Sequence, residues 1–103
     1  MIKCNVVTIK NEIKSINISG HAMYAEPGSD IVCSAVSMLS YAIANKIISI
    51  DEQFDLLITD SQFEFINNLS NSTIDVLLET LYEGLLMVED QYSKYINIEE
   101  VKL

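Results

Sequence analysis

This sequence is poor in the residues that most often hold metals or cross-link chains. Its 103 residues include one histidine and two cysteines, and the two cysteines, Cys4 and Cys33, lie far apart. This spacing matches neither a zinc knuckle nor a thioredoxin-like motif, and two cysteines do not make a disulfide framework. A structural zinc site takes four ligands, so one histidine and two distant cysteines would need a carboxylate to complete it. We therefore expect no metal and no cofactor.

Basic residues are also scarce. Six lysines and arginines stand against 15 aspartates and glutamates, which gives a formal net charge of −9. This charge repels the phosphates of nucleic acid, so direct nucleic-acid binding is not expected. The same field attracts basic partners such as ribosomal proteins, although an acidic surface also serves solubility alone.

Targeting segments and long apolar runs are missing as well. In residues 1–7 apolar residues alternate with polar ones. They do not form a basic segment followed by an apolar run, so we expect no signal peptide. No stretch approaches the length of about 18 uninterrupted apolar residues that a membrane span requires. Half of the residues are hydrophobic and 20% are charged, which excludes a disordered chain. We expect a single domain over residues 1–103, cytoplasmic and without a membrane partner.

The spacing of apolar residues predicts seven elements. Segments rich in β-branched residues predict strands, and an apolar helix is expected to begin near Asp30, with Ser29 or Asp30 as its N-cap. A second helix is amphipathic. The order ββαββαβ predicts an α+β fold in which two helices pack on one mostly antiparallel sheet. The predicted strands are 2–9, 12–19, 53–59, 62–67 and a final edge strand at 95–99, and the helices run from Asp30 to Ile50 and from Ser72 onward.

The stretch from Gly20 to Ser37 contains the only histidine and one of the two cysteines. The predicted helix start places Cys33 in the first turn, where the partial positive charge of the helix end favours a thiolate. His21 follows a strand and precedes a loop that can bring its imidazole beside the helix start. A thiol at a helix N-terminus with a histidine in reach is the arrangement of a cysteine nucleophile, whereas Cys4 lies inside a strand and is expected to be inert.

Residues around this pair have more than one possible role. Asp30 either caps the helix or accepts a hydrogen bond from His21, and capping is the simpler interpretation. Ser37 can supply a polar contact, although small residues in a packed helix usually serve packing. The backbone N–H groups of residues 32–34 are expected to bind a developing oxyanion, because the first N–H groups of a helix lack partners within it. The loop 22–29 is expected to order over a substrate.

One motif is specific enough to indicate a family. It consists of Gly20-His21-Ala22, Tyr24, Gly28 and the run Asp30-Ile31-Val32-Cys33-Ser34-Ala35-Val36-Ser37. This motif resembles the signature of the ribosomal-processing cysteine protease Prp family. The later residues Leu78, Leu81, Gly84, Leu85, Tyr92 and Tyr95-Ile96 are similar to that family's second helix and last strand. Ser34 stands where the family often has alanine.

The resemblance implies a homodimeric α+β protein with a catalytic dyad, here Cys33 and His21. It also implies that the protein removes a short N-terminal extension from a large-subunit ribosomal protein, after an aromatic residue. Two other functions stay open. The protein is alternatively a non-catalytic acidic dimer that binds a basic ribosomal protein, or a thiol redox sensor in which Cys33 suffices without His21.

Overall fold

The fold was analysed in a computed structural model. It describes the backbone of residues 1–20 and 27–103 and the side chains of residues 1–20 and 31–103. The elements are β1 (Ile2–Ile9), β2 (Glu12–Ser19), α1 (Pro27–Ile50), β3 (Asp55–Thr59), β4 (Gln62–Ile66), α2 (Ser72–Tyr92) and β5 (Ile96–Lys102). This order, ββαββαβ, confirms the prediction of an α+β fold.

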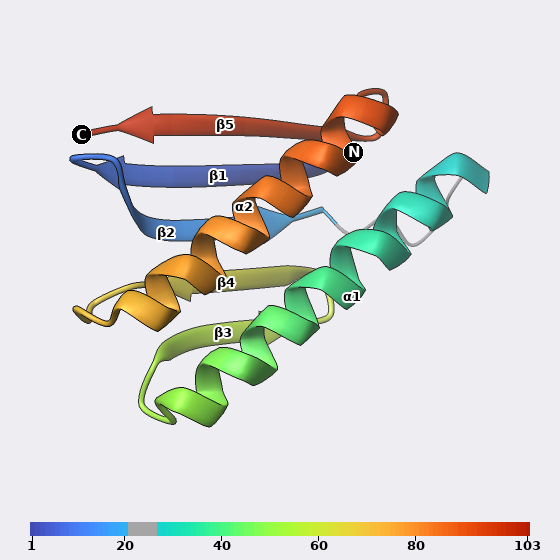
Figure 1. Ribbon diagram of the computed structural model, residues 1–103. Coiled ribbons are helices and arrows are strands. Elements are labelled where there is room, and N and C mark those ends of the chain that lie inside the picture. Colours follow the sequence, from blue (N-terminus) through green and yellow to red (C-terminus); the bar gives the residue numbers. More distant parts are fainter. Residues whose placement is uncertain (21–26) are drawn as a thin grey trace.

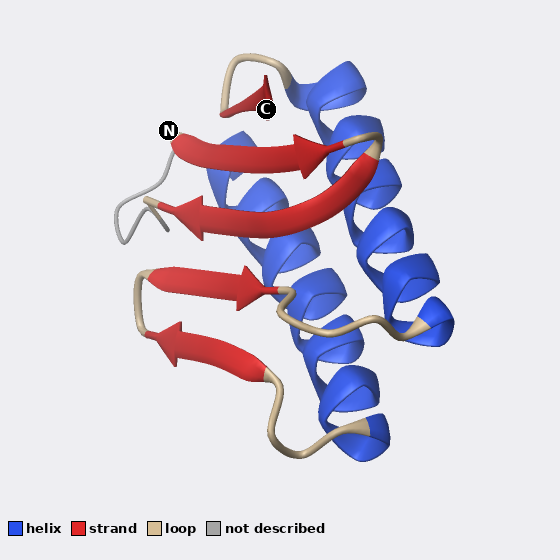
Figure 2. Cartoon of the chain, turned by 90° about the vertical axis from the view of Figure 1, so that its left-hand side faces the viewer, coloured by secondary structure: helices blue, strands red, loops and turns tan. Residues whose placement is uncertain are grey.

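The five strands form one sheet in the order β3-β4-β2-β1-β5. Neighbouring strands are antiparallel except β1 and β5, which are parallel, so the sheet is mixed and mostly antiparallel. Figures 1 and 2 show both helices on the same face of this sheet. The predicted two-layer arrangement is therefore confirmed, with the final strand at an edge as expected.

The core fills the space between the sheet and the two helices. In β1 the residues 2, 4, 6 and 8 point into it, because successive side chains of a strand face opposite sides of a sheet. In β2 the buried residues are Ile13, Ile16 and Ile18, because an irregularity in the pairing opposite Val7 and Thr8 interrupts the alternation. On α2 the buried positions recur at spacings of three and four residues, which is the period of one helix face. The fully buried large side chains include Ile2, Val6, Ile16, Ile18, Ile47, Phe63, Phe65, Ile74, Leu78, Leu81, Leu85 and Ile96.

The β1–β2 hairpin closes through Lys10 and Asn11, the two residues between the predicted strands 2–9 and 12–19. Both residues have positive φ, 52° and 66°, and Ile9 pairs with Glu12. Two consecutive positive φ values are the mark of a type I′ turn, whose twist matches that of the flanking strands. Asparagine tolerates this region well and lysine does so poorly, so the turn lacks the Asn-Gly pair that most often forms it.

The ends of both helices are fixed by side-chain hydrogen bonds. The Asn71 side chain accepts a hydrogen bond of 3.0 Å from the Ile74 N–H and thereby caps α2. After α1, the Asp51 carboxylate accepts a bond of 2.9 Å from the Gln53 N–H. This turn occupies the residues that the sequence pattern assigned to the start of a strand, so β3 begins at Asp55 and not at Gln53.

Helix α1 is unusually apolar for a helix that covers a sheet. Its segment Ile31–Ile50 is long and apolar enough to cross a membrane by length and composition, although several serines and Lys46 interrupt the apolar run. A core helix of a soluble protein passes the same test. One side of α1 does pack in the core, through Val32, Val36 and Ile47.

The two helices are in close contact at Gly84 of α2. A Cβ atom on Gly84 would lie 2.5 Å from Cδ2 of Leu39 on α1, closer than real carbon atoms come. Gly84 therefore has a packing role, because a larger residue would strike Leu39.

Replacement of Gly84 by valine is expected to push Leu39 aside and separate the helices. Overpacking of this kind costs about 1–3 kcal/mol of unfolding free energy, which urea denaturation measures. The double variant Gly84→Val with Leu39→Ala is the control, because it removes the atom that is struck. Recovery of part of the loss in the double variant is expected, and strictly additive losses would contradict the contact.

Candidate active site

Gly20 joins three parts of the sheet at the end of β2. Its φ of +86° is rare for residues that have a side chain, and a Cβ atom there would lie 2.6 Å from the carbonyl oxygen of Met1. Its N–H donates a hydrogen bond of 3.3 Å to the carbonyl of Ser61 in the β3–β4 turn. Only glycine satisfies both the backbone conformation and the close approach. The backbone direction with which the chain leaves the sheet toward His21 is therefore set by Gly20.

His21 itself lies outside the described residues, as do residues 22–26 of the expected lid. The remaining residues of that loop, Pro27 to Ser29, form the first turn of α1. Proline is favoured at the first position of a helix, because its φ is already suitable and its missing N–H would be unpaired there. The expectation that residues 27–29 belong to the loop is therefore wrong.

The early start of α1 also corrects the expected position of Cys33. The helix begins at Pro27 and not near Asp30, so Cys33 is in the second turn and not the first. The N–H groups of residues 32–34 consequently point at carbonyls one turn earlier, and the expected oxyanion site at these groups is wrong. The predicted N-cap at Ser29 or Asp30 is wrong as well, because both residues are already helical.

The Cys33 side chain is half-buried and packs against the edge of the core. Its neighbours Val32 and Val36 are fully buried and fix the rotation of α1 about its axis. Ser37 follows Cys33 by one helical turn, so the two side chains lie on the same side of α1, and Ser37 is also half-buried. The structure thus places Cys33 and Ser37 together, at a border between core and solvent.

Figure 1 shows that β2 ends and α1 begins at the same end of the sheet, which is also where β1 starts and where β3 turns into β4. Cys33 lies in the part of α1 near this end. The sequence motif gave Gly20 and Cys33 but not Met1 and Ser61, the neighbours of Gly20. No local signal could have found these two, because strand pairing between distant segments brings them to Gly20.

The second cysteine has the opposite environment. Cys4 has no exposed surface, and burial, together with the negative charge of Glu89, raises the pKa of its thiol to about 12. At neutral pH the thiolate fraction is then only about 10⁻⁵, and the thiolate is the reactive form. The environment agrees with the prediction that Cys4 is inert.

Alkylation is expected to distinguish the two thiols sharply. With iodoacetamide at pH 7.5, Cys33 should be modified at least about 100-fold faster than Cys4, because Cys4 is both inaccessible and protonated. Peptide mapping by mass spectrometry after timed quenching measures both rates. Unfolding in urea is the control, since it should make the two rates similar. Equal rates in the native protein would contradict the burial of Cys4.

A second polar cluster lies at the far end of the sheet and takes no part in this site. The Glu100 carboxylate accepts hydrogen bonds from the hydroxyls of Tyr82 (2.7 Å) and Thr8 (3.1 Å). The Tyr82 bond holds the pKa of Glu100 below its usual value, and burial with the same bond raises the pKa of Tyr82 to about 12. The cluster therefore acts as a fixed tie between α2, β1 and β5.

Within residues 1–20 and 31–103 no group of three or more histidine, cysteine, aspartate or glutamate side chains is arranged to hold a metal ion.

Comparison with known proteins decides the family. The profile of the cysteine protease Prp family matches residues 1–97. The chain belongs to this family. The Prp resemblance read from the motif is thus confirmed, and with it the enzyme class, a cysteine protease.

Individual relatives agree with this assignment. The ribosomal processing cysteine protease Prp of Staphylococcus aureus (strain Mu50) is 28% identical over 98 residues, which cover 89% of this chain and 92% of the relative. Two crystal structures of S. aureus Prp have the same fold. One, in complex with a substrate peptide, matches with a TM-score of 0.86 and 22% identity, and covers 98% of this chain and 100% of its own. The other, with a covalently linked product peptide, matches with a TM-score of 0.83 and 23% identity, with the same coverage.

Proposed function

We propose that this protein is a cysteine endopeptidase that removes the N-terminal extension of a large-subunit ribosomal protein, with Cys33 as nucleophile and His21 as its base. The observation that carries the proposal is the contrast between the two thiols in a chain of the Prp family. Cys4 is buried and held protonated, whereas Cys33 is half-buried near the end of the sheet at which Gly20 directs the chain toward His21.

The proposed chemistry has two stages. His21 takes the proton of the Cys33 thiol, and the thiolate attacks the scissile carbonyl carbon. The tetrahedral intermediate collapses as His21 returns the proton to the leaving amine, which leaves the N-terminal fragment of the substrate as a thioester on Cys33. His21 then takes a proton from water, hydroxide attacks the thioester, and the thiol is restored. No cofactor or metal enters these steps.

Two further residues act as positioning residues in this proposal. Ser37 lies one turn beyond Cys33 on the same side of α1, where its hydroxyl can limit the rotamers of the thiol. Asp30 lies in the first turn of α1, and a carboxylate there is favoured by the helix dipole. With capping excluded by the helix start, the proposed role of Asp30 is to orient His21.

The charge of the chain supports a basic protein as substrate. A net charge of −9 attracts a ribosomal protein and repels the RNA to which such proteins bind. The relatives named above are ribosomal processing proteases, and one structure holds a substrate peptide. The cytoplasm is the proposed location, since ribosomal proteins are made there, and no membrane or nucleic-acid partner is proposed.

The proposal is tested by trapping the thioester. The wild-type protein is mixed with a synthetic peptide that spans such an extension, quenched in acid after milliseconds to seconds, and analysed by mass spectrometry. Cleavage at one bond, together with acylation of Cys33 and not of Cys4, is the expected result. Binding without cleavage would instead support the non-catalytic module, and rapid oxidation of Cys33 without cleavage would support the redox sensor.

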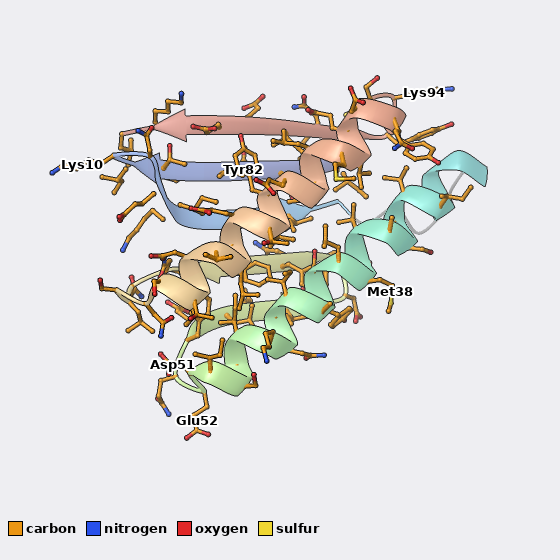
Figure 3. The ribbon with its side chains drawn as sticks, viewed as in Figure 1. Lys10, Met38, Asp51, Glu52, Tyr82 and Lys94 are labelled. Atoms are coloured by element: carbon orange, nitrogen blue, oxygen red, sulfur yellow. The ribbon has the colours of Figure 1, made fainter. Side chains whose placement is uncertain are left out.

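We further propose that the protein is a homodimer that pairs through the outer face of α1. This face exposes Ile31 and Met38, of which Met38 is 70% exposed, and the small residues Ala35 and Ala42 allow a second helix to approach closely. Figure 3 shows Met38 beside α1, on the side that lies away from α2. The apolar character of α1 on both sides is thereby explained.

A charge on this face is expected to separate the dimer. The variant Met38→Glu should sediment as a monomer at concentrations where the wild type is dimeric, because burial of an unpaired carboxylate is unfavourable. Met87→Glu is the matched control, since Met87 is 65% exposed but lies on α2. Analytical ultracentrifugation measures both, and an unchanged dimer in Met38→Glu would contradict the assigned face.

A further inference from the structure

The two edge strands of the sheet, β3 and β5, differ in whether side chains of other elements cover their outward-pointing backbone N–H and C=O groups. At the β5 edge, the Ile98 N–H donates a hydrogen bond of 2.6 Å to the Glu89 carboxylate of α2. Side chains of α2 thus occupy that edge, since Tyr82 also bonds to Glu100 of β5. Such cover is the usual way in which proteins protect an edge strand from pairing with another chain.

The β3 edge has no such cover in the described part of the chain. The Gly20 N–H donates a hydrogen bond to the carbonyl of Ser61, and the Asn67 N–H donates one to the carbonyl of Lys14. The backbone N–H and C=O groups of the odd-numbered residues of β4 therefore point toward β2. The even-numbered residues 62, 64 and 66 then face β3, where they pair with residues 59, 57 and 55. The backbone groups of Leu56 and Ile58 consequently point away from the sheet.

The side chains at this edge leave room for an additional strand. Leu57 is 47% exposed and Ile58 is 36% exposed, and they lie on opposite faces of β3. Residues 55–59 include no lysine and no proline, the two residues that most often block an edge strand. An extended peptide can therefore gain both main-chain hydrogen bonds and apolar contacts here.

The charge around the edge selects the occupant. The segment 51–64 contains no lysine or arginine. Figure 3 shows Asp51 and Glu52 projecting from the connection that leads into β3. The acids of this segment are Asp51, Glu52, Asp55, Asp60 and Glu64. A second copy would bring the same five charges against them, whereas a basic peptide would neutralise them.

We propose that the outer edge of β3 is a docking strand for the substrate, on which a basic, extended segment of polypeptide adds to the sheet. This inference rests on the proposed protease function. The β3–β4 turn contacts Gly20, so a segment paired with β3 leads toward the end of the sheet that holds the candidate active site. A segment paired with the five residues of β3 extends about 17 Å along this edge. In this proposal the docked residues are therefore not the residues of the scissile bond.

Amide hydrogen exchange tests the pairing directly. The probe is a synthetic basic peptide from the N-terminal region of a large-subunit ribosomal protein, added to the Cys33→Ala variant so that it is not cleaved. The amides of Leu56 and Ile58 are expected to gain at least about tenfold protection at saturation, because they become hydrogen-bonded. The amides of Asp55, Leu57 and Thr59, which already bond to β4, should change little. Unchanged exchange at Leu56 and Ile58 with bound peptide would overturn the proposal.

A pair of variants separates the main-chain bond from the side chain. Ile58→Pro removes the outward N–H without touching the β3–β4 ladder, and Ile58→Ala keeps that N–H. The affinity for the peptide, measured by titration calorimetry, should fall about fivefold or more in Ile58→Pro relative to Ile58→Ala, the loss expected for one hydrogen bond. Equal affinities of the two variants would contradict strand addition.

Charge variants test the choice of a basic occupant. The double variant Asp55→Asn with Asp60→Asn should weaken binding about threefold or more at low salt, and the difference should shrink at high salt. The control is Glu79→Gln with Glu83→Gln, which changes the net charge equally on exposed positions of α2. A peptide in which glutamine replaces the lysines and arginines should bind both double variants with the same affinity as it binds the wild type. An equal effect of both variants would overturn the docking site.

The outcomes distinguish this proposal from the protease function. If the wild type cleaves the peptide while Leu56 and Ile58 stay unprotected, the docking strand is wrong and the protease stands. If the peptide protects both amides but no bond is cleaved, the docking strand stands and the proposed cleavage of this extension is wrong. If protection appears without peptide and rises with protein concentration, the occupant is a second copy and the proposal is overturned.

Discussion

Replacement of Cys33 by alanine is expected to lower kcat/KM for the extension peptide by about 10⁴-fold or more, the usual loss on removal of a nucleophile. Replacement of His21 by alanine should cost nearly as much, because an unassisted thiol is a poor nucleophile at neutral pH. The double variant should be no worse than either single one, since the two residues act as a unit. Peptide cleavage followed by chromatography measures all three.

The control for these variants is Cys4→Ala, which removes the other thiol of the chain. Because Cys4 is buried and protonated, its replacement should leave kcat unchanged as long as the protein is folded. Circular dichroism of every variant checks that condition. Loss of activity in Cys4→Ala, with activity retained in Cys33→Ala, would reverse the assignment of the nucleophile.

Replacement of Gly20 by alanine is expected to damage both stability and activity. A left-handed φ costs a residue with a Cβ atom roughly 1–2 kcal/mol, and the clash with the backbone of Met1 adds to that cost. The neighbour is a main-chain oxygen directly before β1, and it cannot move aside as a side chain does. We expect a loss of about 2–4 kcal/mol in unfolding free energy, together with a fall in kcat as His21 is displaced.

Gly84→Ala is the matched control for this experiment. The atom it would strike is the flexible end of the Leu39 side chain, and alanine is the better helix former by about 1 kcal/mol, so little net change is expected. Thermal unfolding and peptide cleavage below the transition measure both variants. Wild-type stability and activity in Gly20→Ala would show that the backbone at the end of β2 relaxes freely.

Local sequence pattern was sufficient for most element boundaries. The strands at 2–9 and 12–19 have the predicted bounds, because their alternation matches a sheet with one buried face. The start of α1 was misplaced because the sequence offers two plausible starts. Aspartate is a good N-cap, which favours a start near Asp30, and proline is a good first helical residue, which favours the observed start at Pro27. The order of the strands and the parallel pairing of β5 were beyond prediction, since no periodicity records which distant strand is a partner.

The candidate site was predictable as residues but not as geometry. The motif around Gly20, His21 and Cys33 indicated the family, and the environment of Cys4 agrees with its predicted inertness. The contact of Gly20 with Met1 and the position of Cys33 in the second turn depend on the tertiary structure. The pairing of His21 with Cys33 stays a prediction.

The parallel pairing of β1 with β5 has a consequence for how the chain folds. Thr8 and Glu100 are 92 residues apart in sequence, so the contacts that complete the sheet have very high sequence separation, which slows folding. Until residues 96–102 have been synthesised, β1 has a partner on one side only, and its other edge can pair with foreign strands. A chain cut short before residue 96 is therefore expected to aggregate, because β5, the last of the five strands in sequence, is the one that covers the free edge of β1.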